Sequence, residues 1–213
     1  VDALVIDNFN EGTVNITDNT TDGVAVTFLN TNLNPNNTIG TTRLTSANLL
    51  SGGGLTVSAD ANPPAGVMGF STDVTAQGQF MLTYDNNGGG LGGVDLTMGG
   101  MSTGIDVFFT AADAGANVTI EVFDGVLTAS QTLATTGMDL FFDFSLFTNT
   151  TALTSAQRIK LTLDGQPNGD YAIDEIPTRM PSMPIIPEPV TAGMGLMALG
   201  ALGLLASRRR VKV

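Results

Sequence analysis

The chain has 213 residues and a formal net charge of -12, and it contains no Cys, no His and no Trp. Without His or Cys it has no Ser-His-Asp or Cys-His nucleophile and none of the usual ligands for zinc or copper. Oxygen ligands alone remain for a metal, and disulfides are excluded. The acidic charge argues against nucleic acid as a partner.

Charge is divided unevenly along the chain. Up to Thr178 there are three basic residues (Arg43, Arg158 and Lys160) and nineteen acidic ones, a balance of roughly -16, whereas the C-terminal end is basic. Thr, Asn, Gly and Asp dominate the polar positions, which is typical of exported β-proteins and poor for helices. The chain opens at Val1 with no basic and apolar leader, so we expect that a signal peptide has been removed.

Residues 1–176 alternate between apolar and polar side chains in many short runs, which predicts strands with one buried face. In chain order, the predicted strands are 4–9, 24–29, 55–59, 80–84, 105–110, 118–122, 140–144, 159–163 and 171–176. Turns rich in Gly, Asn, Asp and Pro separate these runs, and no helical pattern intervenes. The sequence therefore predicts an all-β, antiparallel β-sandwich, either a jelly roll or another Greek key.

Proline marks the end of this domain. Five of the nine prolines lie between Pro177 and Pro189, and such a density predicts a stiff linker over 177–189. Residues 190–207 carry no charge and are mostly apolar, which predicts a single transmembrane helix at the short end of the spanning range. Residues 208–213 form a basic tail that we expect on the cytoplasmic side, so the sandwich lies outside.

The last residues have a tripartite pattern: Pro187-Glu188-Pro189, the apolar helix, and the cluster Arg208, Arg209 and Arg210. In this order, at the C-terminal end, they resemble the PEP-CTERM sorting domain of bacterial surface proteins. The resemblance implies recognition by an exosortase, a membrane-embedded transpeptidase, with cleavage near the Pro-Glu-Pro motif. It also implies a precursor anchored in the inner membrane, followed by transfer to the cell surface or extracellular matrix.

The outer domain resembles, more weakly, the jelly-roll ectodomains often attached to this tail. The likeness depends on a first strand that ends in Asp7-Asn8-Phe9 and a last strand of the Ile-Asp-x-Ile kind at 173–176. In such folds the first and last strands are neighbours, and we expect the same here.

Two sets of oxygen ligands are candidates for calcium. Asp164, Asn168 and Asp170, followed by Glu175, approach the spacing of a calcium loop, although Gln166 interrupts it. A simple Asn-Gly hairpin is the favoured alternative for this segment.

The second set is Asp7 with Asp174, which pairing of the first and last strands would bring close enough to need a cation between them. Solvated charges that protect a sheet edge are the favoured alternative. The glycine-rich segment 88–93 has no phosphate-loop lysine and is expected to be a hairpin loop.

These features favour a non-enzymatic structural or adhesive protein of the bacterial surface or matrix, one that could self-assemble as a homo-oligomer or filament. The alternative is a lectin-like module that binds exopolysaccharide. Glycoside hydrolysis needs only paired carboxylates, but Glu is scarce and no Trp is present to stack on a sugar.

Overall fold

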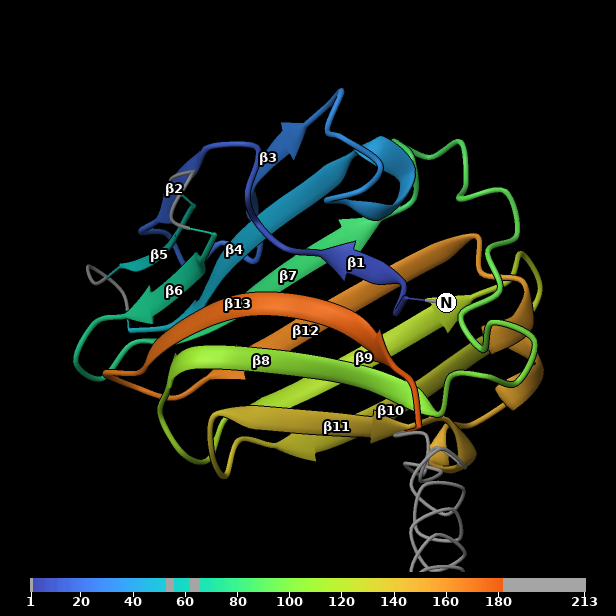
Figure 1. The fold of residues 1–213 in the computed structure, drawn as a ribbon. Coiled ribbons are helices and arrows are strands. Elements are labelled where there is room, and N and C mark those ends of the chain that lie inside the picture. The colour runs from blue at the N-terminus through green and yellow to red at the C-terminus, as the bar shows by residue number, and fades with distance from the viewer. Residues whose placement is uncertain (1, 53–55, 62–65, 182–213) are drawn as a thin grey trace, which may run out of the picture. The chain divides into compact units, whose positions relative to one another are not determined.

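The computed structural model describes residues 2–52, 56–61 and 66–181, which form two antiparallel sheets that face each other (Figure 1). The first sheet contains, in spatial order, β11 (Asp139–Asp143), β8 (Gly104–Ala112), β13 (Asp170–Arg179), β6 (Met68–Thr72), β5 (Val57–Ala61) and β2 (Val14–Asp18), and β1 (Val5–Asp7) also pairs with β13. The second contains β10 (Thr128–Ala134), β9 (Asn117–Phe123), β12 (Arg158–Gly165), β7 (Gln77–Tyr84), β4 (Arg43–Ser51) and β3 (Val26–Asn30). In the described part of the chain, three short 3-10 helices, η1 (Ile39–Thr41), η2 (Phe144–Leu146) and η3 (Thr150–Thr154), lie in the connections. The predicted all-β sandwich is confirmed.

The predicted alternation corresponds to the two faces of each sheet. In β9, Val118, Ile120 and Val122 are buried between the sheets, whereas Thr119 and Glu121 face outward. Such apolar inner faces form one continuous core, whose burial drives the two sheets together.

The connectivity is of the jelly-roll type, because late strands insert between early ones. β13 lies between β8 and β6, and β12 lies between β9 and β7. The first strand pairs with the last, with Val5 opposite Pro177 and Asp7 opposite Ile176, so the predicted neighbourhood of these strands is confirmed.

The predicted boundary between domain and linker is wrong by three residues, because β13 continues through Pro177 to Arg179. Proline lacks only its own amide donor, and the next residue supplies the bonds to β1. The amide of Thr178 donates to the carbonyl of Leu4 at 2.8 Å, and its hydroxyl accepts from the Leu4 amide at 3.0 Å. The predicted membrane helix at 190–207 and the basic tail at 208–213 lie outside the described residues.

Four strands were not predicted: β2, β4, β6 and β10. β4 escaped because its inward positions include Arg43 and Thr45, which break the apolar pattern although both side chains are fully buried. The segment 88–93 is also not a hairpin loop, since β7 and β8 lie in different sheets and residues 85–103 connect them. This connection is held by bonds such as that from the Leu91 amide to the Gln157 carbonyl at 2.9 Å.

A buried ion pair ties β1 to the second sheet. Nη1 of Arg43, on β4, lies 2.9 Å from Oδ2 of Asp7, on β1, and both side chains are fully buried. The hydroxyl of Tyr84, on β7, donates to the same carboxylate oxygen at 3.0 Å. Burial raises the pKa of Asp7, which the Arg43 guanidinium opposes. The pair therefore fixes the position of β1 relative to both sheets.

The loop after β1 closes around the same guanidinium. Nη2 of Arg43 donates to the carbonyls of Glu11 at 3.0 Å and Gly12 at 2.7 Å. Gly12 has a φ of 77°, and a Cβ there would lie 3.0 Å from Nη2. Glycine is needed at this position because its backbone must both adopt a left-handed conformation and approach the buried cation.

Removing the Asp7 charge tests this arrangement. We expect Asp7→Asn to lower the free energy of unfolding by about 3–5 kcal/mol, because it leaves Arg43 buried without its anion. Chemical denaturation of the full chain in detergent measures the change. Asp106→Asn is the matched control, because its partner Arg179 is 43% exposed and the loss there should be about 1 kcal/mol. Equal losses in the two variants would contradict the structural role given to the Asp7 pair.

Within the described part of the chain, no helix has the length and apolar character needed to cross a membrane.

Candidate functional site

The candidate site lies where one side of β13 changes its neighbouring strand from β6 to β1. Residues up to Ile173 pair with β6, whereas Ile176 and Pro177 pair with β1. The strand register also shifts between Ile173 and Glu175, which is the mark of a β-bulge. As a result Ile173 and Ile176 both point into the core, while Asp174 is exposed and Glu175 is half-buried.

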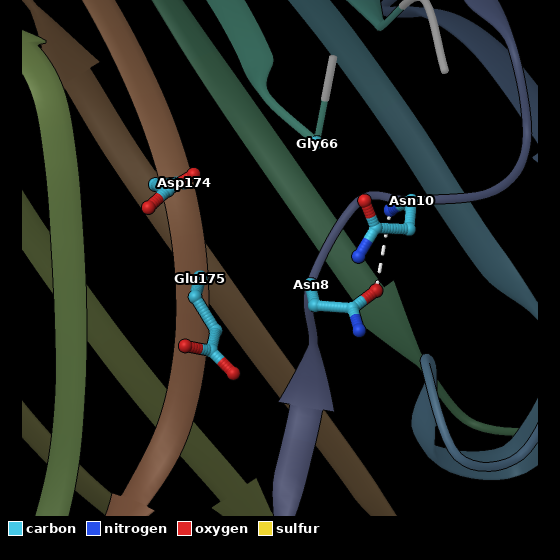
Figure 2. Close-up of a pocket in the computed structure, with 5 residues that line it drawn as sticks. All are labelled: Asn8, Asn10, Gly66, Asp174 and Glu175. Atoms are coloured by element: carbon cyan, nitrogen blue, oxygen red, sulfur yellow. Dashed lines mark hydrogen bonds between the residues drawn. The ribbon is translucent and has the colours of Figure 1, made fainter. Parts of the chain in front are cut away.

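A polar hollow of about 270 Å³ occupies the place where β6 ends its pairing and β1 begins. It is lined by Asn8, Asn10, Gly66, Asp174 and Glu175. Figure 2 shows the two acidic residues on β13, across the hollow from the two asparagines that follow β1. The hollow is thus bounded by the first and last strands, which are far apart in the sequence.

Asn8 is held in place by two hydrogen bonds. Its side-chain oxygen accepts from the amide of Asn10 at 3.2 Å, and its Nδ2 donates to Oδ1 of Asn37 at 3.0 Å. On the opposite wall, burial and then the neighbouring Asp174 carboxylate raise the pKa of Glu175. The site therefore combines one fixed amide wall with one acidic wall.

The described side chains of this hollow offer hydrogen-bonding groups on both walls. Carboxylates accept hydrogen bonds and amides both donate and accept, a set that suits the hydroxyls of a sugar. The carboxylate oxygens of Asp174 and Glu175 and the amide oxygens of Asn8 and Asn10 are of the kind that binds calcium. The two described carboxylates lie on β13, and the opposite wall offers asparagine side chains.

The predicted pairing of Asp7 with Asp174 around calcium does not form. The strands do pair, but the Asp7 carboxylate is fully buried and binds Arg43, whereas Asp174 is exposed at the hollow. The alternative of solvated edge charges is wrong for Asp7, because none of its side chain reaches solvent.

The predicted calcium loop at 164–170 is not assembled either. Oδ1 of Asp164 accepts from Nε2 of Gln79 at 2.7 Å, while the amide of Asp170 donates to Oδ2 of Asp113 at 2.9 Å. Asn168 occupies a left-handed turn with a φ of 56°. The segment is not a hairpin, because β12 and β13 lie in different sheets and the turn arches between them. In residues 2–52, 56–61 and 66–181, no three His, Cys, Asp or Glu side chains gather closely enough to hold a metal.

A second, smaller hollow of about 140 Å³ lies beside the glycine-rich connection. Its lining residues are Asp85, Gly88, Gly90, Phe123, Gln157 and Arg158. The Arg158 guanidinium lies 5.0 Å from the centre of the Phe123 ring, a cation-π contact that keeps the cation at the surface.

Sequence patterns did not point to Asn8, Asn10 or the second hollow. Asparagine is common in this chain, so the presence of Asn8 and Asn10 in a loop does not by itself indicate a binding site. Glu175 was noted only for its spacing after Asp164, and the bulge that turns it outward is a property of strand pairing.

Comparison with known families identifies the C-terminal segment. Residues 186–210 match the family model described as the PEP-CTERM protein-sorting motif. The chain carries a PEP-CTERM sorting motif. The match includes Pro187, Glu188, Pro189 and the arginines at 208–210, so the predicted sorting signal is confirmed. The motif marks exported proteins that the C-terminal region anchors before exosortase processing, so the chain is an exported protein of the cell surface. These residues lie outside the described ones.

Several solved structures are similar to this chain at low identity and low TM-score. The family 11 carbohydrate-binding module of the cellulase Lic26A-Cel5E from Clostridium thermocellum is 13% identical, with 85% of this chain and 96% of that chain covered and a TM-score of 0.41. TmCBM61, solved with β-1,4-galactotriose, is 16% identical over 54% of this chain and 70% of that chain, with a TM-score of 0.30. The lectin domain of lectinolysin is 12% identical over 55% and 73%, with a TM-score of 0.31. These likenesses concern the fold alone, and no curated protein matches the chain.

The raised pKa of Glu175 predicts a pH-dependent effect of neutralising it. A raised pKa in the folded state means that the stabilising contribution is present below the ordinary value of 4.5 and is lost as the pH rises. We therefore expect Glu175→Gln to raise the melting temperature at neutral pH by about 2 °C or less, with the gain shrinking in acid. Thermal melting followed by circular dichroism measures it.

Glu121→Gln is the control for this experiment, because Glu121 forms an ion pair with Lys160 and its loss should not raise the melting temperature. A gain for Glu175→Gln that is independent of pH would contradict the assigned cause.

Proposed function

We propose that this chain is a non-enzymatic structural or adhesive protein of the bacterial cell surface or extracellular matrix. The observation that carries the proposal is the sorting motif at 186–210, joined through a proline-rich segment to a folded sandwich. The motif delivers the chain to the surface, and the sandwich is the part that acts there.

Two buried carboxylates, those of Asp7 and Asp106, are paired with arginines, which supports a role without catalysis. Asp7 is committed to Arg43, and Asp106 is committed to Arg179, which donates to it from Nε at 2.8 Å and from Nη2. A catalytic carboxylate must lie within hydrogen-bond reach of its substrate, and these two are occupied by their arginine partners. The open pair, Asp174 and Glu175, comes from one strand and lies on one side of its hollow.

The hollow beside β13 favours a second candidate, a lectin-like module that binds exopolysaccharide. Its amide and carboxylate groups can exchange hydrogen bonds with several sugar hydroxyls at once. The proposed polysaccharide is neutral, because the acidic wall at Asp174 and Glu175 would repel an anionic one.

Processing at the sorting motif tests the delivery step. We expect mass spectrometry of the mature protein from its native cells to find a C-terminus near Pro187–Pro189, and cell fractionation to find the chain at the surface. The double variant Pro187→Ala/Pro189→Ala should keep its full-length mass and be retained in the membrane. Pro181→Ala/Pro184→Ala is the matched control and should be processed normally. A parent chain recovered from the cytosol would overturn the proposal.

Glycan binding separates the two candidates. If the chain is lectin-like, Asp174→Asn should weaken binding of the full chain to its matrix polysaccharide by about tenfold or more, through lost hydrogen bonds to a charged acceptor. Asp139→Asn removes another exposed carboxylate, on β11, and should leave binding unchanged. Absence of polysaccharide binding by the parent chain on a glycan array would remove the lectin-like candidate and leave the structural role.

A further inference from the structure

In the described part of the chain β1 pairs only with β13, and apart from it the two sheets end in four edge strands that differ in how they are protected. β2 and β3 form one end of the sandwich, and β10 and β11 form the other (Figure 1). An edge strand presents unpaired amides and carbonyls, and proteins block such edges with charges, loops or capping side chains unless the edge has a partner.

Side chains and a neighbouring loop protect three of the edges. On β10, Ser130 exchanges bonds with Thr148, whose amide donates to the Ser130 carbonyl at 3.1 Å and whose hydroxyl accepts from the Ser130 amide at 3.0 Å. β11 begins with Asp139 and ends with Asp143. β2 ends with Asp18, whose carboxylate accepts from the Leu49 amide of β4 at 2.8 Å.

On β3 only the last residue is tied to a neighbouring segment, since Nδ2 of Asn30 donates to the Thr13 carbonyl at 3.1 Å. Among the described residues, Val26–Leu29 have no comparable bond beyond their pairing with β4. The partner of β3 on one edge is β4, and Val26, Thr27, Phe28 and Leu29 are all exposed. Val24, just before the strand, is 66% exposed and Phe28 is 42% exposed. Residues 23–30 include no charged residue and no proline, in a sequence of β-branched and aromatic residues that favours strand pairing.

We propose that β3 is an interface through which two copies of this chain pair, edge to edge and antiparallel, to extend the second sheet across a two-fold axis. The inference names the surface for the self-assembly considered above. It rests on the proposed function only for the high local concentration of copies at a cell surface.

Charge is the reason that the partner is a second copy. Up to Thr178 the chain carries roughly -16, so two copies repel each other wherever their carboxylates face. A two-fold axis at Thr27 places Val26 opposite Phe28 of the other copy, and Asp22 opposite Asn32 rather than opposite the other Asp22. The uncharged strand thus lets two acidic molecules meet without opposing charges, while its apolar side chains lose contact with water.

One strand pair buries less surface than the roughly 800 Å² per partner of a standard interface, so the association should be weak in dilute solution and effective on a crowded surface.

Because the chain has no Cys, a single introduced thiol reports the pairing directly. In full-length Thr27→Cys, purified in detergent and oxidised, the axis brings two thiols within disulfide distance. The matched control is Thr132→Cys, an exposed threonine in the middle of β10, the opposite edge strand of the same sheet. We expect about tenfold or more disulfide-linked dimer for Thr27→Cys than for Thr132→Cys.

Equal yields at the two positions, no dimer at Thr27, or a disulfide from Thr27 to a different polypeptide would each overturn the inference. As a second measurement, Thr27→Lys should abolish the chemically cross-linked dimer without changing the melting temperature. The reason is that it places two ammonium groups opposite each other across the axis, where they repel. Thr132→Lys adds the same charge and should cross-link like the parent.

The two proposals fail separately. Loss of β3 pairing in a chain that still reaches the surface would remove the interface and leave the proposed function. A chain that pairs at Thr27 in detergent but is not found at the surface would remove the proposed function and leave the interface.

Discussion

The buried ion pair between Asp7 and Arg43 determines where the first strand lies. Moving two charges out of water costs several kcal/mol per ion, and the cost is offset only when the remaining hydrogen-bonding groups find partners. Here the guanidinium also donates to two carbonyls of the loop that follows β1, and Tyr84 donates to the carboxylate. β1 is thereby held against β13, and Asn8 and Asn10 are placed beside the gap that β6 leaves on that strand.

β13 connects this hollow to the end of the domain. It contributes Asp174 and Glu175 at its bulge and then continues to Arg179. There Arg179 pairs with Asp106 and stacks 4.0 Å from the ring centre of Phe141, while its carbonyl accepts from the Thr103 amide at 2.8 Å.

Much of the sandwich could be predicted because local alternation reports which strands have one buried face. Prediction failed where the inward side chains are polar: β4 buries Arg43 and Thr45, and its pattern resembles a loop. It also failed at Pro177, because a proline does not end a strand when the next residue makes the hydrogen bonds to the neighbouring segment. The turn at 164–170 has the composition of a hairpin, but composition does not reveal that its two strands belong to different sheets.

The sequence alone determined the class of fold and the destination of the chain. Side chains alternate between the two faces of a pleated strand, so the alternation in the sequence predicts the strands. The sorting signal is defined by the order of motif, apolar segment and arginines along the chain, so the sequence also predicts the destination. Only the tertiary structure decided the roles of the acidic residues. Asp7 and Asp174 have similar surroundings in the sequence, yet one is a buried counterion and the other lines an open hollow. That difference depends on Arg43, 36 positions after Asp7, and on a bulge where β13 pairs with β8.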